Sequence, residues 1–265
     1  MSRSRDILVI DDEPVVLQGV VRICQSEGFS VDATSSGRTG LDHLDRYVYR
    51  LILCDIMMGD LDGFEFLAES QRRGIRTPVV MATGNSTVQN AVRSLRHGAI
   101  DCLAKPFTAD ELMAVVTRGL RYQALRSAGG EEPPGSNRCP AHLRRLGYLS
   151  WAAVESVGTV LVGLHEVFLR TLEGIRSIAP VAEGTEIVQG AGCVSIVSAD
   201  GLVHEAMAPV SGRVIEVHAA LATEPTAIER DPYGSGWLYR VLPADLQSCL
   251  MCLSSCSNSS DSQHS

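Results

Sequence analysis

The sequence predicts two domains: an α/β domain built on a doubly wound, five-stranded parallel sheet, and a small, mostly β domain after it. Three observations predict this. Up to residue 127, five apolar runs of strand length alternate with five helical patterns, which is typical of right-handed βαβ units. A polar, turn-rich stretch at 128–137 cannot bury a core. From residue 146 the apolar runs are short and separated by Gly, Pro and Ser.

The first domain opens with an apolar run that ends in the acidic pair Asp11 and Asp12. Pro14 then suits the first turn of a helix, and Gly28 suits its end. The expected strands are 6–10, 29–33, 51–55, 78–83 and 100–104, and the expected helices are 14–28, 36–45, 64–73, 86–97 and 108–127. With 265 residues, 45% of them hydrophobic, the chain can supply a core to each domain.

Polar residues follow four of these strands where each strand ends: Asp11 and Asp12, Asp55, Thr83, and Lys105. Because the carboxyl ends of parallel strands meet at one edge of a sheet, these side chains should lie together. Clustered carboxylates repel one another unless a cation lies between them, and Mg²⁺ suits hard oxygen ligands and phosphate. Taken alone, Asp11 and Asp12 could also cap a helix, and Asp55 could be a surface residue. Together the five predict a site for phosphoryl transfer.

Lysine usage supports that interpretation. Of the 23 basic residues, 22 are arginine, and Lys105 is the only lysine in the chain. A compact, movable ammonium beside a phosphate is not replaced well by a planar guanidinium, which gives a chemical reason for lysine at this position.

These motifs resemble the receiver domain of response regulators in two-component signalling, a flavodoxin-like domain, and the resemblance covers about residues 5–127. They are Asp11-Asp12, Asp55-x-x-Met58, Thr83-Gly84 and Lys105-Pro106-Phe107. The resemblance implies that a sensor histidine kinase phosphorylates Asp55. It also implies that Lys105 and Thr83 contact the phosphate. The Mg²⁺ ligands that it implies are Asp11 (largely through water), Asp12, Asp55 and the backbone carbonyl of Met57.

Two positions depart from the family pattern. Gly59 and Asp60 follow Met58 where the family usually has proline and glycine, which predicts a more flexible and more acidic loop. Cys102 stands where many members have a Tyr or Phe that turns inward on activation. A smaller side chain there could leave a pocket for a partner or weaken the allosteric response.

The second domain resembles the glycine cleavage H protein, a lipoyl-type β-sandwich. The motifs that carry the resemblance are Gly158–Gly163, Pro180–Thr185, Ala208–Val217 and Asp231–Leu238, and Asp200-Gly201 predicts a two-residue hairpin turn. In that family lipoate is attached to a hairpin lysine eight positions before the proline of Pro-Val-Ser-Gly. Counting back from Pro209 gives Gly201, and residues 106–265 contain no lysine. We therefore expect no lipoate on this chain.

These patterns predict a first domain at 1–127, a flexible linker at 128–145, a second domain at 146–247 and a disordered tail at 248–265. The tail contains Cys249, Cys252 and Cys256, which could bind a metal ion if His264 supplied a fourth ligand. Their spacing is equally compatible with one face of a frayed helix or with a disordered end. Both alternatives stay open at this point.

The charge and composition of each segment limit the classes of partner that the chain can bind. Residues 1–141 carry 16 basic and 18 acidic groups, and residues 142–265 carry 7 and 13, so the net charges are −2 and −6. Neither half offers the basic face that nucleic-acid binding needs. No apolar run is long enough to span a membrane, and the first residues lack a secretory signal. We therefore expect a cytoplasmic protein with reduced cysteines, and neither nucleic acid nor membrane as a partner.

Three functions of different class fit the sequence. The first is a phosphorelay response regulator whose second domain binds an unidentified protein. The second is an accessory of lipoate-handling or glycine-cleavage enzymes that phosphorylation controls. The third is a DNA-binding regulator, which the charge of −6 and the lack of a helix-turn-helix pattern after residue 141 disfavour. We expect no enzymatic activity apart from the chain's own aspartyl phosphoryl transfer and autodephosphorylation.

Overall fold

The computed structural model describes residues 3–84, 88–129 and 139–256. The chain divides into two compact units, Met1–Ala124 and Leu125–Ser265. Each unit is described by itself.

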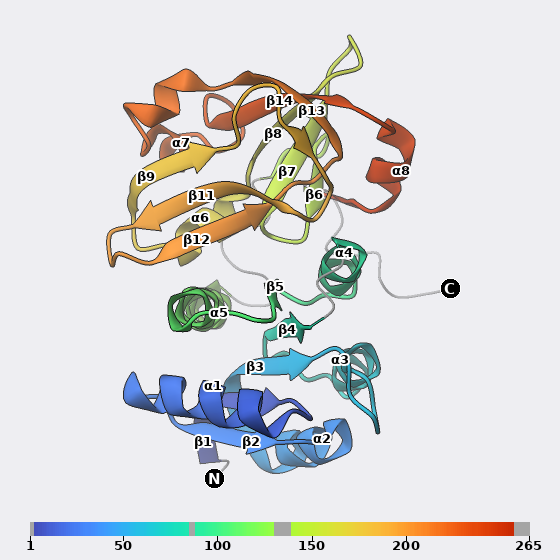
Figure 1. Cartoon of the computed structure of the whole chain (residues 1–265), viewed down its shortest axis with the longest axis vertical. Helices are drawn as coiled ribbons and strands as arrows, with labels where there is room; N and C mark the ends of the chain where they lie inside the picture. The colour runs from blue at the N-terminus through green and yellow to red at the C-terminus, as the bar shows by residue number, and fades with distance from the viewer. Residues whose placement is uncertain (1–2, 85–87, 130–138, 257–265) are drawn as a thin grey trace. The chain divides into compact units, whose positions relative to one another are not determined.

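The first unit contains a five-stranded sheet in the order β2-β1-β3-β4-β5, in which all neighbouring strands are parallel (Figure 1). Its strands are β1 (Arg3–Ile10), β2 (Val31–Thr34), β3 (Tyr47–Asp55), β4 (Val79–Thr83) and β5 (Asp101–Ala104). The helices are α1 (Pro14–Ser26), α2 (Gly37–Arg46), α3 (Gly63–Arg72), α4 (Val88–Arg96) and α5 (Ala109–Gly129). The predicted doubly wound α/β fold is confirmed.

Helices cover both faces of this sheet (Figure 1). Alternate residues of β1 point to opposite faces: Ile7 and Val9 pack in a cluster with α1 and α5, and Leu8 and Ile10 pack in a cluster with α2 and α3. Because both faces are buried there, the segments 7–10, 51–54 and 79–82 are continuous apolar runs that do not alternate with polar residues. This pattern of burial places the polar residues at the strand ends, where the loops begin.

Local sequence explains where the helices begin. Pro14 occupies the first turn of α1, where the missing N–H has no helical partner in any case. The Ser36 side chain accepts a hydrogen bond from Thr39 N at the start of α2. Asp62 and Glu65 form a reciprocal capping box at the start of α3. The loop after Asp55 therefore ends at a firmly fixed helix start.

β3 begins earlier than predicted, at Tyr47 rather than at residue 51. The additional residues pair with the start of β1, with Tyr47 opposite Arg3 and Tyr49 opposite Arg5. Tyr49 is buried, and its hydroxyl donates a 2.7 Å hydrogen bond to Asp32. The sequence pattern missed this extension because tyrosine and arginine do not form an apolar run, although their backbone completes the ladder.

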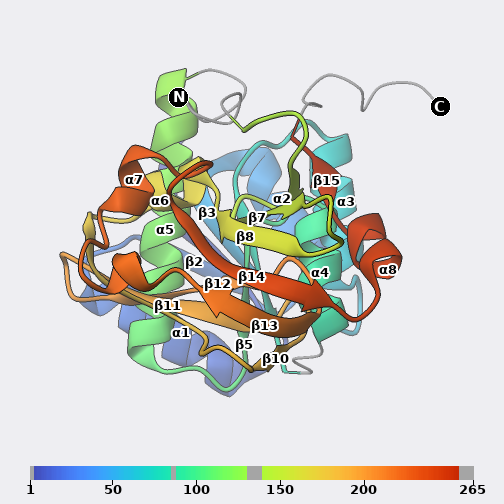
Figure 2. The same cartoon turned by 90° about the horizontal axis from the view of Figure 1, so that it is seen from above.

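The second unit is mostly β, as predicted, and its paired strands are antiparallel. One sheet has the order β10-β13-β14-β8-β7-β6-β15 and the other β12-β11-β9. Figure 2 shows β8, β14 and β13 side by side. The strands are β6 (Arg144–Leu146), β7 (Ser150–Val154), β8 (Val160–Leu164), β9 (Ile175–Pro180), β10 (Glu186–Ile187), β11 (Gly192–Ser198), β12 (Val203–Met207), β13 (Gly212–Val217), β14 (Trp237–Pro243) and β15 (Ser254–Ser255). The helical segments are α6 (Glu166–Thr171), the 3₁₀ helix η2 (Ala219–Ala222), α7 (Ala227–Arg230) and α8 (Leu246–Met251).

The expected disordered tail is wrong for residues 248–256. The Asp245 side chain caps α8, and Ser254 and Ser255 of β15 pair with β6. The predicted linker is also too long, because β6 begins at Arg144. Both errors have one cause: the end of the chain pairs with the start of the second unit, and that pairing is far from local in sequence. Residues 257–265 lie outside the described residues.

A disulfide joins Cys139 to Cys256, and the other six cysteines have free thiols. The expectation of reduced cysteines is therefore wrong for this pair. The two residues are 117 positions apart, and the described residues that surround them include Leu143 and Trp151 of one hydrophobic cluster. Nothing in their spacing could have paired them. Within the described residues, none of the helices is long and apolar enough to cross a membrane.

We predict that reducing this disulfide destabilises the second unit by about 2–4 kcal/mol, because the crosslink restricts the unfolded chain. Both tryptophans, Trp151 and Trp237, lie in this unit, so urea denaturation followed by tryptophan fluorescence reports on it alone. Cys139→Ser should unfold at lower urea than wild type and should no longer respond to dithiothreitol. Cys252→Ser removes a free thiol and should respond to dithiothreitol as wild type does. Identical wild-type curves with and without reductant would contradict the prediction.

Candidate functional site

The candidate site lies at the carboxyl edge of the parallel sheet, where β3 delivers Asp55. This residue is 3% exposed. The backbone holds it from both sides, because the next amide, Ile56 N, donates to Ala82 O of β4 at 2.9 Å, and Met57 N donates to Asp55 Oδ1 at 3.3 Å. The carboxylate is therefore fixed at the end of a central strand and keeps its second oxygen for other partners.

The other carboxylates come from the end of β1. Asp11 is buried, and its Oδ1 accepts a hydrogen bond from Glu13 N at 3.0 Å, whereas Asp12 is exposed. Asp11, Asp12 and Asp55 each offer an oxygen within 4.8 Å of the others. This spacing lets one small cation contact all three groups.

Lys105 crosses from the end of β5 to these carboxylates. Its Nζ lies 2.7 Å from Asp11 Oδ2, 2.9 Å from Asp55 Oδ2 and 3.0 Å from Glu13 Oε1, and the side chain is 7% exposed. Burial by itself would lower the pKa of Lys105, but its hydrogen bonds to Asp11, Asp55 and Glu13 outweigh burial and raise the pKa. The ammonium therefore stays charged.

The cluster as a whole is negative, since a single ammonium faces several carboxylates. Burial raises the pKa of Asp11, and the neighbouring charge of Asp55 acts in the same direction. Such a site favours any added positive charge. Its oxygen ligands, partly open through exposed Asp12, fit Mg²⁺, which binds few protein groups and keeps several waters.

Thr83 and Cys102 lie on the next two strands of the sheet after β3, which are β4 and β5. Thr83 ends β4 and is buried, and its carbonyl accepts a 2.7 Å hydrogen bond from Lys105 N. Cys102 on β5 is half-buried and packs against the core cluster that includes Met81 and Phe64. Burial raises the pKa of the Cys102 thiol to about 12, so it is protonated and poorly nucleophilic at neutral pH.

Two carboxylates near the site were missed as functional candidates. Glu13 contacts Lys105, and its position directly after the acidic pair could have suggested this. The Asp60 carboxylate accepts hydrogen bonds from Ser36 Oγ, Gly37 N and Arg38 N at the start of α2. The expected flexible loop therefore has an anchor that its glycine content did not reveal.

In the second unit, Gly201 lies in the turn between β11 and β12 with φ of 86°. The strands end at Ser198 and resume at Val203, so the connection is longer than the predicted two residues. Ser198 Oγ lies 2.8 Å from His204 Nε2 and also contacts Asp200. A side chain at position 201 would meet no atom within 4 Å but would require a left-handed backbone, which is strained for a lysine.

The cysteines of the tail do not assemble as a metal site of three thiols. Cys256 is bonded to Cys139, and Cys249 Sγ accepts a hydrogen bond from Ser211 N. His165 lies beside the disulfide and offers a ring nitrogen within 4.8 Å of both sulfurs. Its Nδ1 already accepts a hydrogen bond from Val167 N, and its ring packs edge-on against Tyr148 and Tyr233, so His165 is better suited to packing than to metal binding. His264 lies outside the described residues.

Comparison with known proteins also divides the chain into two parts, because two different families match its two units. The response regulator receiver domain family matches residues 7–117, and the glycine cleavage H-protein family matches 143–261. The regulatory protein AtoC of Escherichia coli (strain K12) is 36% identical over 127 residues, which are 48% of this chain and 27% of AtoC. The transcriptional regulatory protein TcrA of Mycobacterium tuberculosis (strain ATCC 25618 / H37Rv) is 38% identical over 123 residues, 46% of each chain. This chain thus spans less than half of either relative.

Among solved structures, a glycine cleavage system H protein from Mycobacterium marinum is 30% identical to this chain. The match covers 40% of this chain and 86% of that one, with a TM-score of 0.37.

We predict that Lys105→Met destabilises the first unit, because it leaves Asp11 and Asp55 buried together without their counter-charge. The loss should be about 3 kcal/mol, the lower end of the range for breaking a buried ion pair, since the cluster is open to solvent at Asp12. Mg²⁺ should recover part of it.

The measurement is urea denaturation followed by circular dichroism at 222 nm, with and without MgCl₂. Arg38→Met, which removes an exposed cation from the same unit, is the control and should cost little. A Lys105→Met protein as stable as wild type without metal would show that the carboxylates do not repel one another appreciably.

Proposed function

We propose that this chain, which carries a response regulator receiver domain followed by a glycine cleavage H-protein domain, is a phosphorelay response regulator that a histidine kinase phosphorylates on Asp55. One observation carries the proposal: a buried carboxylate at the end of a central parallel strand contacts the only lysine of the chain and lies within 4.8 Å of two further carboxylates. That combination suits transfer of a phosphoryl group to an aspartate.

The chemistry assigns a role to each group. One oxygen of Asp55 forms a bond to phosphorus while the bond from phosphorus to the donor breaks. Lys105, already 2.9 Å from Asp55 Oδ2, is placed to pair with the phosphoryl oxygens. Asp11, Asp12, Asp55 and the Met57 carbonyl would hold Mg²⁺, which offsets negative charge on the phosphoryl group when it is bound.

The switch would follow from the added charge. A phosphoaspartate brings acceptor oxygens to the ends of β4 and β5, and the Thr83 hydroxyl and Lys105 ammonium are the donors there. Cys102 has no aromatic ring to move, so we propose that the response does not use an aromatic side chain at this position. Thr83 and Lys105 would carry the change to the loops after β4 and β5.

We further propose that the H-protein domain works without lipoate, as a protein-binding surface. The position that aligns with the lipoyl lysine by motif spacing is Gly201, and no lysine follows residue 105. The domain nevertheless keeps two antiparallel sheets and a buried core that includes Trp151 and Tyr239. A preserved core without the attachment residue supports binding to a partner rather than carriage of a group.

The match to the glycine cleavage H-protein family favours one alternative, in which the second domain docks on lipoate-handling or glycine-cleavage enzymes and phosphorylation controls the docking. Recovery of such an enzyme with the native protein would support it. Some relatives, such as TcrA, are transcriptional regulators, and the match to TcrA covers 46% of this chain. A DNA-binding role for this chain is therefore the weaker proposal, given the charge of −6 in residues 142–265.

We predict that wild type incubated with acetyl phosphate and Mg²⁺ gains one phosphate, measured as the mass of the intact protein. Asp55→Asn should gain none, because the amide cannot act as the acceptor. Chelation of Mg²⁺ with EDTA should abolish the adduct on wild type. Equal adducts on both proteins, or none on wild type with Mg²⁺ present, would rule out Asp55 as the acceptor.

We predict that Lys105→Arg impairs the conformational response although it keeps the positive charge, because a planar fork cannot take the place of the compact ammonium. Thr83→Ala should leave phosphorylation largely intact and weaken the response. The measurement is the change in amide NMR shifts of α4 and β5 on adding beryllofluoride. If Lys105→Arg showed the same shift changes as wild type, positive charge alone would be sufficient for the conformational response.

We predict that phosphorylation changes the affinity of the second domain for its protein partner by roughly 5- to 150-fold, the usual range of an allosteric coupling of about 1–3 kcal/mol. A pull-down from the native cell with residues 125–265, which keep Cys139 and its disulfide, would identify the partner. Its affinity for the full chain is then compared with and without beryllofluoride, with Asp55→Asn as control. Equal affinities would make the second domain a constitutive tether, and a lipoyl adduct on the native protein would contradict the non-carrier role.

A further inference from the structure

The loop between β3 and α3, residues 57–62, is held to the sheet at both ends. Ile56 N donates to Ala82 O, and Ile56 O accepts Gly63 N at 3.0 Å. A Cβ at Gly63 would lie 2.3 Å from Asp55 O, so only glycine allows this close return of the chain. Both ends of the loop therefore meet beside Asp55.

The first part of the loop has local contacts, since Met57 N donates to Asp55 Oδ1 and the Met58 side chain packs in the core, but the part after it is less restrained. Gly59 is exposed, and a Cβ built there would meet nothing within 4 Å. Met57 is also exposed, with 61% of its surface accessible. Glycine gives the backbone many accessible conformations, so contacts farther along the loop add to those that hold Met57 and Met58 in fixing the direction of the carbonyls near position 57.

Asp60 makes those contacts. Its Oδ2 accepts hydrogen bonds from Ser36 Oγ at 2.6 Å and from Arg38 N at 3.3 Å, and its Oδ1 accepts one from Gly37 N at 3.2 Å. These amides belong to the first turn of α2, where free N–H groups and the helix dipole favour a carboxylate. The hydrogen bond from Ser36 is the main reason why the pKa of Asp60 is lowered to about 2, so the group stays ionised at neutral pH.

The contact also closes the gap between the loop and α2. A Cβ at Gly37 would lie 2.7 Å from the Leu61 carbonyl, so the two backbones pass in close contact directly beside the Asp60 hydrogen bonds. Asp60 thus fastens the loop to a helix that packs on the sheet through buried Leu41. Gly59 leaves the loop backbone flexible, and the contacts with α2 restrict it.

We infer that Asp60 is a positioning residue for the Mg²⁺-dependent phosphorylation of Asp55: by fastening the loop to α2 it fixes the backbone of Met57, whose carbonyl the metal site uses. This inference rests on the proposed function. Groups that orient a metal ligand without touching the metal commonly matter to metal affinity by 10- to 100-fold. Asp60 acts through Met57 and therefore touches neither phosphate nor metal.

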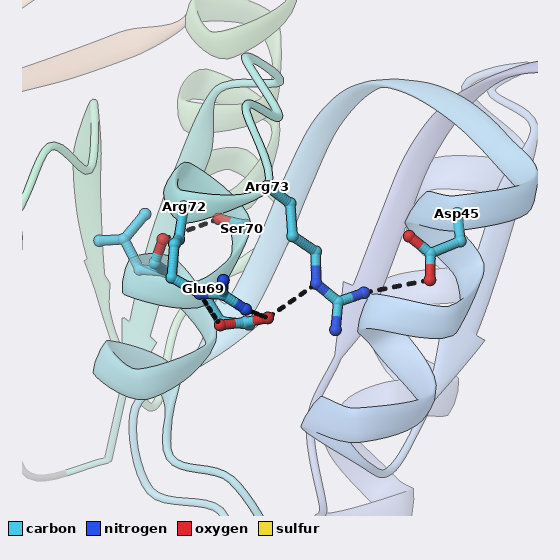
Figure 3. A network of polar contacts seen from close by, with 6 residues as sticks. Asp45, Glu69, Ser70, Arg72 and Arg73 are labelled. Carbon is cyan, nitrogen blue, oxygen red and sulfur yellow. Dashed lines mark hydrogen bonds and ion pairs between the residues drawn. The ribbon is translucent and has the colours of Figure 1, made fainter.

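The chain offers a matched control at the other end of the same two elements. Asp45, near the end of α2, pairs with Arg73 at the end of α3 at 3.0 Å, and Arg73 also contacts Glu69 (Figure 3). Like Asp60, Asp45 is a carboxylate that joins α2 to the segment after β3. It lies at the helix end remote from Ser36, so removing it should affect stability without affecting the loop.

The test compares Mg²⁺ affinity and phosphorylation in the full-length protein. Dissociation constants come from NMR titrations with MgCl₂, and initial rates come from acetyl phosphate labelling at low and at saturating Mg²⁺. Asp60→Ala should raise the Mg²⁺ dissociation constant roughly 10-fold, and its labelling rate should fall at low Mg²⁺ and recover at saturation. Asp60→Asn and Ser36→Ala should give smaller shifts in the same direction. Asp45→Asn should match wild type in both measurements.

The inference is overturned if Asp60→Ala binds Mg²⁺ with the wild-type dissociation constant while its melting temperature falls as in Asp45→Asn. Asp60 would then be a helix cap only. If Asp60→Ala does not fold, Asp60→Asn and Ser36→Ala decide by the same criterion. If wild type itself neither binds Mg²⁺ nor accepts phosphate, the proposed function fails, and this inference fails with it. The two failures are therefore distinguishable by the wild-type result.

Discussion

The first unit depends on holding two carboxylates, Asp11 and Asp55, in a buried position at the edge of a sheet. Like charges so placed repel strongly in a medium of low dielectric. Lys105 makes the arrangement possible, since its ammonium reaches both carboxylates and Glu13. The cluster still carries an excess of negative charge, and that excess favours a bound cation. The stability of the unit and its fitness for a metal ion therefore have the same electrostatic origin.

The elements around the cluster serve its geometry. The run 51–54 of the central strand is apolar and buried and ends at Asp55, and hydrogen bonds through Ile56 lock that end to β4 and to α3. Thr83 O accepts the backbone amide of Lys105, so the neighbouring strands fix one another at the site. The loop after Asp55 relies in addition on a side chain, Asp60, for its position. A response that starts at this edge would spread through the few loops that meet there.

The second unit is held together in a different way. Its sheets are antiparallel, and its first and last strands, β6 and β15, pair beside the disulfide between Cys139 and Cys256. Ser198, His204 and Asp200 organise the turn that contains Gly201 with hydrogen bonds in place of a modified lysine. A carrier arm at this turn needs a long side chain that is free to move. Here the turn is polar and internally bonded, and Gly201 has no side chain.

The sequence by itself determined the order of elements in the first unit, because apolar runs of strand length and helical periodicity depend only on local spacing. It also placed Asp11, Asp12, Asp55, Thr83 and Lys105 at one edge, since parallel strands bring their carboxyl ends together. In the second unit, the turn near Asp200-Gly201 was visible, but β9 was not. Its buried residues Ile175 and Ile178 are three positions apart and lack the alternation typical of a strand.

Only the tertiary structure decided the contacts between residues far apart in sequence. The pairing of β15 with β6, the disulfide across 117 positions and the early start of β3 each depend on a partner that local patterns cannot identify. The same holds for Asp60. In the sequence it looks like any other acidic loop residue, and it anchors the loop only because the free amides of α2 lie beside it in the fold. Local periodicity specifies elements, whereas side-chain partners follow from packing, and packing is a property of the whole unit.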